Sequence, residues 1–331
     1  MKRIAIIGAG AWGTALAMVA GRAGCDVVIH AREAEVANSI NKVHENTVFL
    51  PGYVLDSKIR AVTDPLNAVN TAEAVLLVTP AQHVRATVTA LSGALKPETP
   101  VIICAKGIEQ KTSALMSEVV SGVLPGASIA VLSGPTFAAE VASDLPTAVT
   151  LACQDHDLGA LLTLVLATPH FRIYRSDDII GAEIGGAVKN VLAIACGIVD
   201  GRNMGDNTRA ALITRGLAEI VRLGLAKGAM AQSLMGLAGI GDLTLTCTAI
   251  QSRNYSLGVA LGEGQSLNNI LSLRNSVAEG VFTANSVTTL ADDLGIEVPI
   301  CTAVNGILNS GADIDETITG LLNRPFTSET F

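Results

Sequence analysis

Lys189 stands out because it is the only basic residue in the apolar stretch 177–200, which carries adjacent glycines at Gly185 and Gly186. Isoleucine and valine recur in this stretch at steps of three and four residues, which predicts one long helix. The same steps place Lys189 on the face that holds the glycines. Glycine costs a helix about 1 kcal/mol relative to alanine, so the adjacent pair indicates that another group comes close. An amine on such a bare face could donate a proton to a carbonyl oxygen.

Two other interpretations of this stretch stay open. A tightly packed helix pair could carry a lysine whose amine extends to water. A membrane-spanning helix is disfavoured, because it would place Glu183, Lys189 and Asn190 deep in the hydrocarbon.

A second chemical signal is the GxGxxG fingerprint formed by Gly8, Gly10 and Gly13. It follows a β-branched run at 3–7, and a second strand-like run follows at 27–30. Gly8 permits the turn, Gly10 lets backbone approach a pyrophosphate, and Gly13 lets helix and strand pack closely. The helix N-terminus would then offer unpaired N–H groups to the phosphates. A glycine-rich turn without a ligand is the alternative, but the strand–turn–helix context favours a dinucleotide site.

The end of the second strand bears on the choice of coenzyme. A site for NAD usually places Asp or Glu there to bind the ribose hydroxyls, whereas arginine accommodates a 2′-phosphate. Arg32 therefore favours NADP(H) or the use of both coenzymes, although Glu33 is its neighbour. A solvated loop charge is the other interpretation of Arg32.

Two further polar segments follow strand-like runs. Lys106 comes just after the run at 100–105, and the turn 133–137 (SGPTF) follows the run at 128–133. In parallel α/β sheets, ligands bind beyond the carboxyl ends of the strands. Each segment by itself could also be an ordinary loop.

The second half carries its own polar cluster. Asp242 ends the glycine turn 239–242 and is placed to cap the segment that follows. Ser252, Arg253 and Asn254 open another helix, where arginine, an amide and free N–H groups could hold a phosphate. A pure cap and a surface ion pair remain the alternatives for Asp242 and Arg253.

Composition limits the class of protein. The chain has 331 residues, 49% of them hydrophobic and only 3% aromatic, so the core must be built from Ala, Val, Leu and Ile. A net charge of −8 argues against broad nucleic-acid binding. The six scattered cysteines show no metal-like spacing and fit free thiols in a reducing compartment. Lys2 and Arg3 before an apolar run resemble a signal peptide, but the fingerprint glycines interrupt that run.

The pattern of elements predicts an α/β fold: a Rossmann-type, doubly wound and largely parallel sheet followed by a mainly α-helical domain. We expect a dinucleotide-binding domain at 1–180 and a helical substrate domain at 181–331. The expected strands are 3–7, 27–30, 74–79, 100–105, 128–133, 146–152 and 171–176. The expected later helices are 207–227, 230–237, 252–262, 266–273, 283–294, 299–310 and 315–322.

Several motifs occur in the order found in bacterial NAD(P)-dependent glycerol-3-phosphate dehydrogenases, which this sequence resembles over essentially its whole length. They are GAGAWGTALA, AKGIE around Lys106, SGPTFAAEVA, GGAVKNVLAI around Lys189, GIGDLTLTC and QSRN. SGPTFA and GGAVKN discriminate better than the glycine fingerprint does. Trp12 stands where some relatives have Tyr or Phe.

The resemblance implies a catalytic acid/base role for Lys189. It implies substrate contacts at Lys106, Gly134, Thr136, Lys189, Asp242, Ser252, Arg253 and Asn254. Beside the fingerprint glycines Gly8, Gly10 and Gly13, it implies cofactor contacts at Ala11, Trp12, Arg32, Lys106, Ala138, Arg253, Val277 and Glu279. No metal site is expected.

The implied reaction interconverts dihydroxyacetone phosphate and sn-glycerol 3-phosphate with NADP(H) or NAD(H), and it supplies glycerophospholipid synthesis. We expect a cytoplasmic enzyme with a phosphorylated small-molecule substrate and no integral membrane segment, plausibly a homodimer. The alternatives are a dehydrogenase acting on a hydroxy acid, a non-enzymatic dinucleotide sensor and a methyltransferase.

Overall fold

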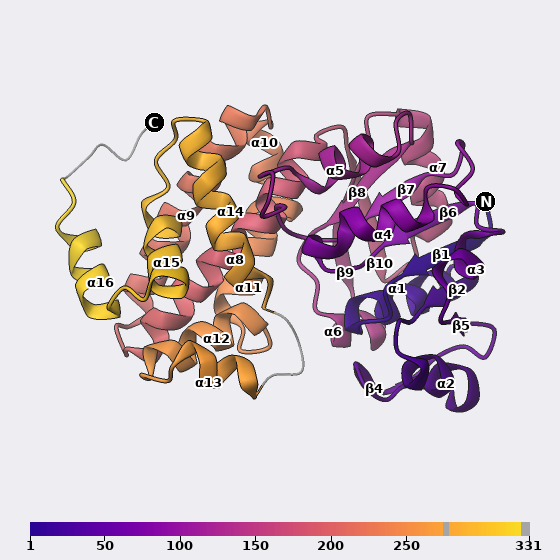
Figure 1. The fold of residues 1–331 in the computed structure, drawn as a ribbon, viewed down its shortest axis with the longest axis horizontal. Helices are drawn as coiled ribbons and strands as arrows, with labels where there is room; N and C mark the ends of the chain where they lie inside the picture. Colours follow the sequence, from indigo (N-terminus) through magenta and orange to yellow (C-terminus); the bar gives the residue numbers. More distant parts are fainter. Residues whose placement is uncertain (274–277, 326–331) are drawn as a thin grey trace.

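The chain folds into a sheet-containing half and a helical half that lie side by side (Figure 1). The computed structural model describes residues 1–273 and 278–325. One sheet has eight strands, and a separate hairpin has two. The strands of the large sheet are β1 (Arg3–Ile7), β2 (Asp26–His30), β5 (Arg60–Val62), β6 (Ala74–Leu77), β7 (Val101–Ile103), β8 (Ile129–Ser133), β9 (Thr147–Ala152) and β10 (Phe171–Ser176). The hairpin consists of β3 (Glu45–Asn46) and β4 (Leu50–Val54).

The strand order of the large sheet is β10-β9-β8-β7-β6-β1-β2-β5. Neighbouring strands are parallel except for β8 and β9, which are antiparallel. The chain runs outward from β1 to β2 and β5, and then returns to the other side of β1 at β6. This reversal is the topological switch point at which doubly wound folds bind ligands, beyond the carboxyl ends of the strands. The predicted fold class is confirmed.

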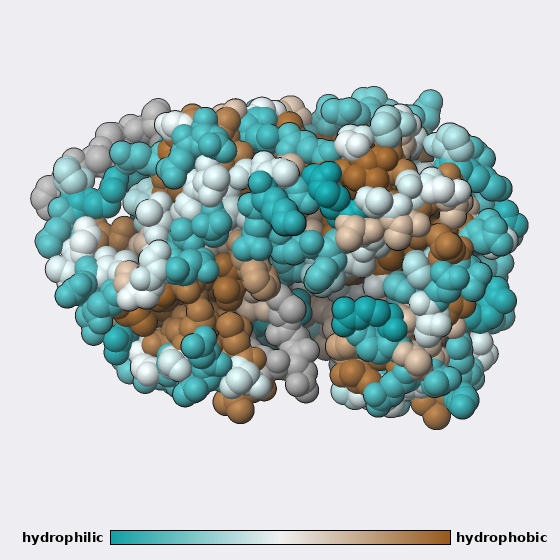
Figure 2. Space-filling model, viewed as in Figure 1, coloured by the Kyte–Doolittle hydropathy of each residue, from teal (hydrophilic) through white to brown (hydrophobic). Residues whose placement is uncertain are grey.

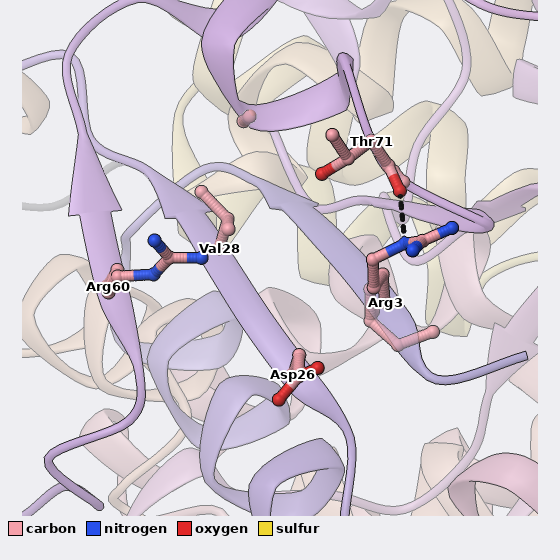
Figure 3. A pocket seen from close by; sticks show the side chains of 8 residues that line it. Arg3, Asp26, Val28, Arg60 and Thr71 are labelled. Atoms are coloured by element: carbon pink, nitrogen blue, oxygen red, sulfur yellow. Dashed lines mark hydrogen bonds between the residues drawn. The ribbon is translucent and has the colours of Figure 1, made fainter.

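The opposite, amino-terminal edge of the sheet carries a small polar hollow of about 60 Å³ (Figure 3). Arg3, Asp26 and Arg60, the first residues of β1, β2 and β5, line it. The Arg3 side chain there donates a 2.8 Å hydrogen bond to the carbonyl oxygen of Thr71. Because of its position at the amino ends of parallel strands, this hollow is remote from the edge where the fold places its chemistry.

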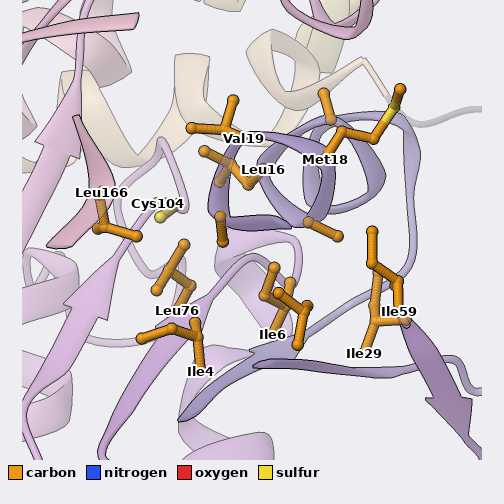
Figure 4. Packing of buried hydrophobic residues seen from close by; sticks show 14 of the residues in the cluster. Ile4, Ile6, Leu16, Met18, Val19, Ile29, Ile59, Leu76, Cys104 and Leu166 are labelled. Carbon is orange, nitrogen blue, oxygen red and sulfur yellow. The ribbon is translucent and has the colours of Figure 1, made fainter. Parts of the chain in front are cut away.

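Helices cover both faces of the sheet. Ile4 and Ile6 of β1 point toward one face, where they pack with Leu16 and other residues (Figure 4). Ala5 and Ile7 point toward the other face. This alternation follows from the two-residue repeat of a strand. The first face is packed by α1 (Ala11–Arg22), α2 (Ala34–Val43), α6 (Ala138–Ala142) and α7 (His156–Leu166). The second is packed by α3 (Pro65–Val69), η1 (Ala81–His83), α4 (Val84–Leu91) and α5 (Met116–Val123).

The helical half is organised around α8 (Ile179–Gly201), which is buried along nearly its whole length. Gly197 and Gly201 of α8 lie against Gly258 and Gly262, and a Cβ on any of the four would overlap with backbone of the facing helix. The small residues therefore let two helices approach closely. The surrounding elements are α9 (Asp206–Lys227), α10 (Ala231–Leu234), the π-helical turn η2 (Leu237–Gly241), α11 (Asp242–Thr248), α12 (Arg253–Gly262), α13 (Leu267–Ser272), α14 (Glu279–Asp293), α15 (Pro299–Ser310) and α16 (Ile314–Leu322).

Within the described part of the chain, α8 is long and apolar enough to cross a membrane, and the bent segment Ala231–Thr248 with Arg253–Gly262 also passes on composition. However, 89% of the apolar window of α8 is buried inside the fold. The core helix of a globular protein has these properties.

Most predicted elements are present, with two corrections. The helix predicted at 230–237 is interrupted: α10 ends at Leu234 and η2 begins at Leu237, because Gly236 and Gly239 allow the backbone to fold tightly back on itself. The threonine-rich segment that follows was not predicted as a helix but forms α11, which packs against α8. No elements were predicted at 31–73, where α2, the hairpin, β5 and α3 lie.

Candidate active site

The fingerprint residues form the predicted loop at the end of β1. Gly8 has φ +119°, and a Cβ there would lie 3.0 Å from the backbone of Val78. A Cβ on Gly13 would overlap with the Gly8 carbonyl. Above Gly10, by contrast, a Cβ would meet nothing within 4 Å among the described residues. The loop is therefore packed closely on its inner side and open on its outer side.

The open side of the loop fits a dinucleotide. Gly10 is the N-cap of α1, and within the described ranges no side chain caps this helix end. Its first N–H groups can therefore accept a phosphate. Ala11 and Trp12 follow directly in the first turn, and the buried indole N–H of Trp12 has no hydrogen-bond partner among the described residues. A donor left unpaired in this way is accounted for by a ligand at the loop.

Arg32 follows β2 but is paired with its own neighbour. Its guanidinium donates to the Glu33 carboxylate at 2.7 and 3.0 Å, and the Arg32 side chain is 83% exposed. The cation is thus available at the surface, and the adjacent carboxylate competes for it. This arrangement keeps the use of either coenzyme open.

Lys189 lies in the interior of the protein, with only 8% of its side chain exposed. Its Nζ donates to one carboxylate oxygen of Asp242 and to the hydroxyl of Thr246 at 2.9 Å. The Thr246 hydroxyl in turn donates to the Asp242 carbonyl at 2.6 Å, one turn back along α11. The interpretation of Lys189 as a lysine that extends to water is therefore wrong.

Lys106 approaches the same carboxylate from the sheet. It follows β7, and its Nζ donates to the other oxygen of Asp242 at 2.6 Å and to the Gly134 carbonyl at 3.0 Å. The Asp242 side chain is completely buried between the two lysines. The prediction that Asp242 caps the following segment is wrong: the N-cap of α11 is Gly241, and the carboxylate is committed to the lysines instead.

The burial of Lys189 changes its acidity. Removal from water lowers the pKa of Lys189 to about 8, because burial disfavours the charged amine. The Asp242 charge opposes this and the Lys106 charge adds to it. Both causes expected from the sequence, burial and a second lysine, are therefore present.

The adjacent glycines of α8 have different neighbours. A Cβ on Gly185 would overlap with the Ala238 carbonyl of η2. A Cβ on Gly186 would lie 2.9 Å from the Ser133 hydroxyl and 3.4 Å from Cγ of Lys106. The predicted close approach thus comes from backbone at Gly185 and from the stem of a site lysine at Gly186.

The segment 252–254 opens α12 as predicted. The Ser252 hydroxyl caps the helix by accepting from the Tyr255 N–H at 3.2 Å. The Asn254 amide is buried, donates to Asn190 at 2.9 Å and accepts from the Gly280 N–H at 3.0 Å. It therefore connects α12 with α8 and α14, and one of its N–H groups remains for a ligand.

Arg253 is exposed and lies close enough to Glu279 to affect it electrostatically. Burial raises the pKa of Glu279, and the Arg253 charge opposes that effect. One Glu279 oxygen accepts from the Ala81 N–H at 3.4 Å, while the other has no partner among the described residues. Glu279 therefore connects the helical half to the sheet half and keeps a free acceptor, which fits its implied cofactor contact.

The remaining predicted residues are less tightly placed. The Thr136 hydroxyl donates to the Gly134 carbonyl at 3.3 Å, beside Lys106. Ala138 is the first residue of α6. Val277 lies outside the described residues. In the part of the chain that the structure describes, no cluster of His, Cys, Asp or Glu could hold a metal ion, and all six cysteines are free.

Sequence reasoning missed two residues of this site, Thr246 and Asn190. Thr246 lies one helical turn after Asp242, so the i, i+4 spacing could have indicated it once α11 was recognised. Asn190 directly follows Lys189, and only the fold shows that its side chain binds Asn254.

The fold and site define a nicotinamide-dinucleotide oxidoreductase: a glycine loop at the switch point of a doubly wound sheet, with a buried lysine pair at the carboxyl edge. Two family models match, NAD-dependent glycerol-3-phosphate dehydrogenase N-terminus over residues 3–159 and C-terminus over residues 178–319. The chain belongs to the NAD(P)-dependent glycerol-3-phosphate dehydrogenase family.

Individual relatives agree. The chain is 55% identical over 329 residues to glycerol-3-phosphate dehydrogenase [NAD(P)+] of Parvibaculum lavamentivorans, covering 99% of this chain and 98% of that protein. It is 56% identical to the protein of the same description from Rhodospirillum rubrum, covering 99% and 94%. The crystal structure of glycerol-3-phosphate dehydrogenase from Coxiella burnetii is 40% identical, with a TM-score of 0.94 over 98% of this chain and 99% of that one.

The fold itself is shared more widely. D-mandelate dehydrogenase aligns with a TM-score of 0.65 at 16% identity, covering 96% of this chain and 100% of that one. At that identity the likeness extends to the fold alone.

Proposed function

We propose that this NAD(P)-dependent oxidoreductase interconverts dihydroxyacetone phosphate and sn-glycerol 3-phosphate, with Lys189 as the acid/base. The observation that carries the proposal is the carboxylate of Asp242 held between Lys106 and Lys189 at the carboxyl edge of the sheet. Neither a dinucleotide sensor nor a methyltransferase needs a buried amine pair of this kind.

The bound coenzyme supplies the hydride. Lys189 supplies the proton: with a pKa of about 8 it is mostly protonated at neutral pH, yet it gives up the proton far more readily than a solvated lysine. Asp242 and Thr246 hold its Nζ in place. In the reverse direction the neutral amine accepts the proton of the alcohol.

Charge balance favours the developing alkoxide. Two lysines share one carboxylate, so the cluster keeps an excess of positive charge in a site that excludes most water. In a chain with a net charge of −8, such local excess also attracts an anionic substrate. Arg253, at the N-terminal end of α12, is placed to bind the substrate phosphate.

The test is NADPH and NADH oxidation with dihydroxyacetone phosphate, compared with hydroxy-acid precursors such as pyruvate and with no added ketone. Selective oxidation with dihydroxyacetone phosphate supports the proposal. Preference for a 2-keto acid would favour the hydroxy-acid alternative, and coenzyme binding without turnover would favour a sensor.

A second measurement tests Lys189 itself. Lys189→Ala should retain coenzyme binding but lose turnover by about 10²–10⁴-fold. Lys111→Ala, an exposed lysine near the same loop, is the matched control. Near-normal turnover of Lys189→Ala would refute the acid/base role.

The physiological setting follows from the reaction. The product supplies the backbone of glycerophospholipids, and a reducing cytoplasm suits six free cysteines. Apolar residues gather on one face over α12, α13 and α15 (Figure 2). This surface suits a homodimer, which light scattering of the purified protein would detect.

A further inference from the structure

The hairpin β3–β4 reaches the glycine loop through one side chain, Asn46. Its Nδ2 donates to the carbonyl oxygen of Ala9 at 2.8 Å and to the hydroxyl of Thr14 at 2.8 Å. Its Oδ1 accepts from the Phe49 N–H at 3.0 Å. The Asn46 side chain is completely buried, and both of its amide hydrogens are used.

These contacts determine the orientation of a peptide group in the loop. The C=O of Ala9 and the N–H of Gly10 belong to one trans peptide plane and point in opposite directions. Because Asn46 holds the Ala9 carbonyl inward, the Gly10 N–H points outward. Gly10 is exposed on that side, and its N–H has no partner among the residues that the structure describes.

The second contact connects the loop to its helix. Thr14 lies in the second turn of α1, and its N–H already donates to the Gly10 carbonyl at 2.9 Å. Asn46 therefore joins residues on both sides of the helix N-terminus. Both of its targets are acceptors, so the site needs a side chain with two donors, which a carboxylate cannot provide.

We propose that Asn46 is a positioning residue for the coenzyme: it orients the Ala9–Gly10 peptide and the start of α1 so that their N–H groups face the pyrophosphate. The hairpin is anchored to α2 separately, through the Ser39 hydroxyl, which donates to the Glu45 carbonyl at 2.6 Å. Asn46 acts on coenzyme binding and takes no part in the proton transfer. The inference depends on coenzyme use but is independent of the ketone substrate.

The test uses Trp12, the only tryptophan of the chain, whose fluorescence reports on the loop. Asn46→Asp replaces the donor by a carboxylate facing the Ala9 carbonyl and close to the bound phosphates. We expect the Kd for NADPH and for NADH, titrated by Trp12 fluorescence, to rise about tenfold or more. At saturating coenzyme, kcat and the KM for dihydroxyacetone phosphate should stay within about twofold of wild type.

Three variants separate this role from a general loss of packing. Ser39→Ala loosens the hairpin without touching the loop and should leave the Kd unchanged. Thr14→Val removes one acceptor and should weaken coenzyme binding, while Thr14→Ser keeps the hydroxyl and should restore it. These two also carry the test if Asn46→Asp does not fold.

An unchanged Kd in folded Asn46→Asp, or equal Kd values for Thr14→Val and Thr14→Ser, would overturn the inference. So would a fall in kcat at saturating coenzyme without a change in Kd. Because the fluorescence titration contains no ketone, failure of the proposed reaction would leave this result readable.

Discussion

Lys189 and Asp242, on two different helices, form an ion pair in which the carboxylate is completely buried. The amine and the carboxylate lie 53 residues apart in the chain. The pair keeps the lysine partly charged in surroundings that would otherwise remove its proton, because the Asp242 charge raises the pKa that burial lowers. This balance leads to the first prediction.

Asp242→Asn should lower the pKa of Lys189 further below 8, since the main opposing charge is removed. In ketone reduction the protonated amine is needed, so kcat should fall as the pH rises through that pKa. The pH–rate profile of the variant should therefore decline at a lower pH than that of wild type. Asp200→Asn, at the exposed end of α8, is the control and should leave the profile in place. A decline at the wild-type pH would contradict the role of the pair.

The two glycines of α8 should respond differently to alanine. Gly185→Ala places a methyl group against the Ala238 carbonyl, and we expect a loss of stability of about 2 kcal/mol or more despite the better helix propensity. Gly186→Ala meets the Ser133 hydroxyl and the stem of Lys106, which are side chains and can shift. It should remain folded but turn over slowly. Urea unfolding together with kcat separates the two, and equal effects on both measurements would argue against this assignment.

Arg253→Ala should chiefly weaken binding of the phosphorylated substrate. Loss of a charge-assisted contact to phosphate should raise the KM for dihydroxyacetone phosphate about tenfold or more. Arg215→Ala, an exposed arginine on α9, should leave the KM as in wild type. Steady-state kinetics at saturating coenzyme provide the measurement, and an unchanged KM in the Arg253 variant would count against its phosphate role.

Arg32 and Glu33 should control coenzyme preference in opposite directions. Arg32→Ala should lower kcat/KM for NADPH more than for NADH, because only NADPH carries the 2′-phosphate. Glu33→Gln removes the carboxylate that pairs with Arg32 and should favour NADPH. Equal changes for both coenzymes in each variant would show that this pair does not contact the ribose.

Glu183 predicts a pH dependence of stability. Its buried carboxylate accepts from the Ser117 N–H at 2.8 Å and from the Ser117 hydroxyl, and burial raises its pKa to about 7. Nearby Glu118 raises it as well. Between the unfolded pKa of about 4.3 and the folded value, the folded state binds the proton and the unfolded state releases it. The free energy of unfolding from this group therefore falls as the pH rises through that window.

Glu183→Gln keeps an acceptor for the Ser117 N–H but does not titrate. Its urea unfolding should lose less stability than wild type between about pH 5 and about pH 8. Glu98→Gln, at an exposed position, should follow wild type. Parallel curves for Glu183→Gln and wild type would show that the carboxyl of Glu183 titrates normally.

Local patterns in the sequence were enough for much of the fold. Alternating β-branched runs and glycine spacing predict β1, the loop at Gly8 and helix α1, because strand and helix periods and turn geometry depend on residues near in the chain. The apolar period of α8 predicts its length for the same reason. The elements at 31–73 escaped prediction, since the two-residue β3 and three-residue β5 are too short to show a period.

The site depended on contacts that no local pattern contains. Lys106 and Asp242 are 136 residues apart, and Asp242 looked like a helix cap until the fold placed two lysines on its carboxylate. The sequence by itself determined which residues could do chemistry: a lysine among glycines, a glycine loop and an arginine at a helix start. Only the tertiary structure decided which of them share one charge, because burial and electrostatic balance arise when distant segments pack together and exclude water.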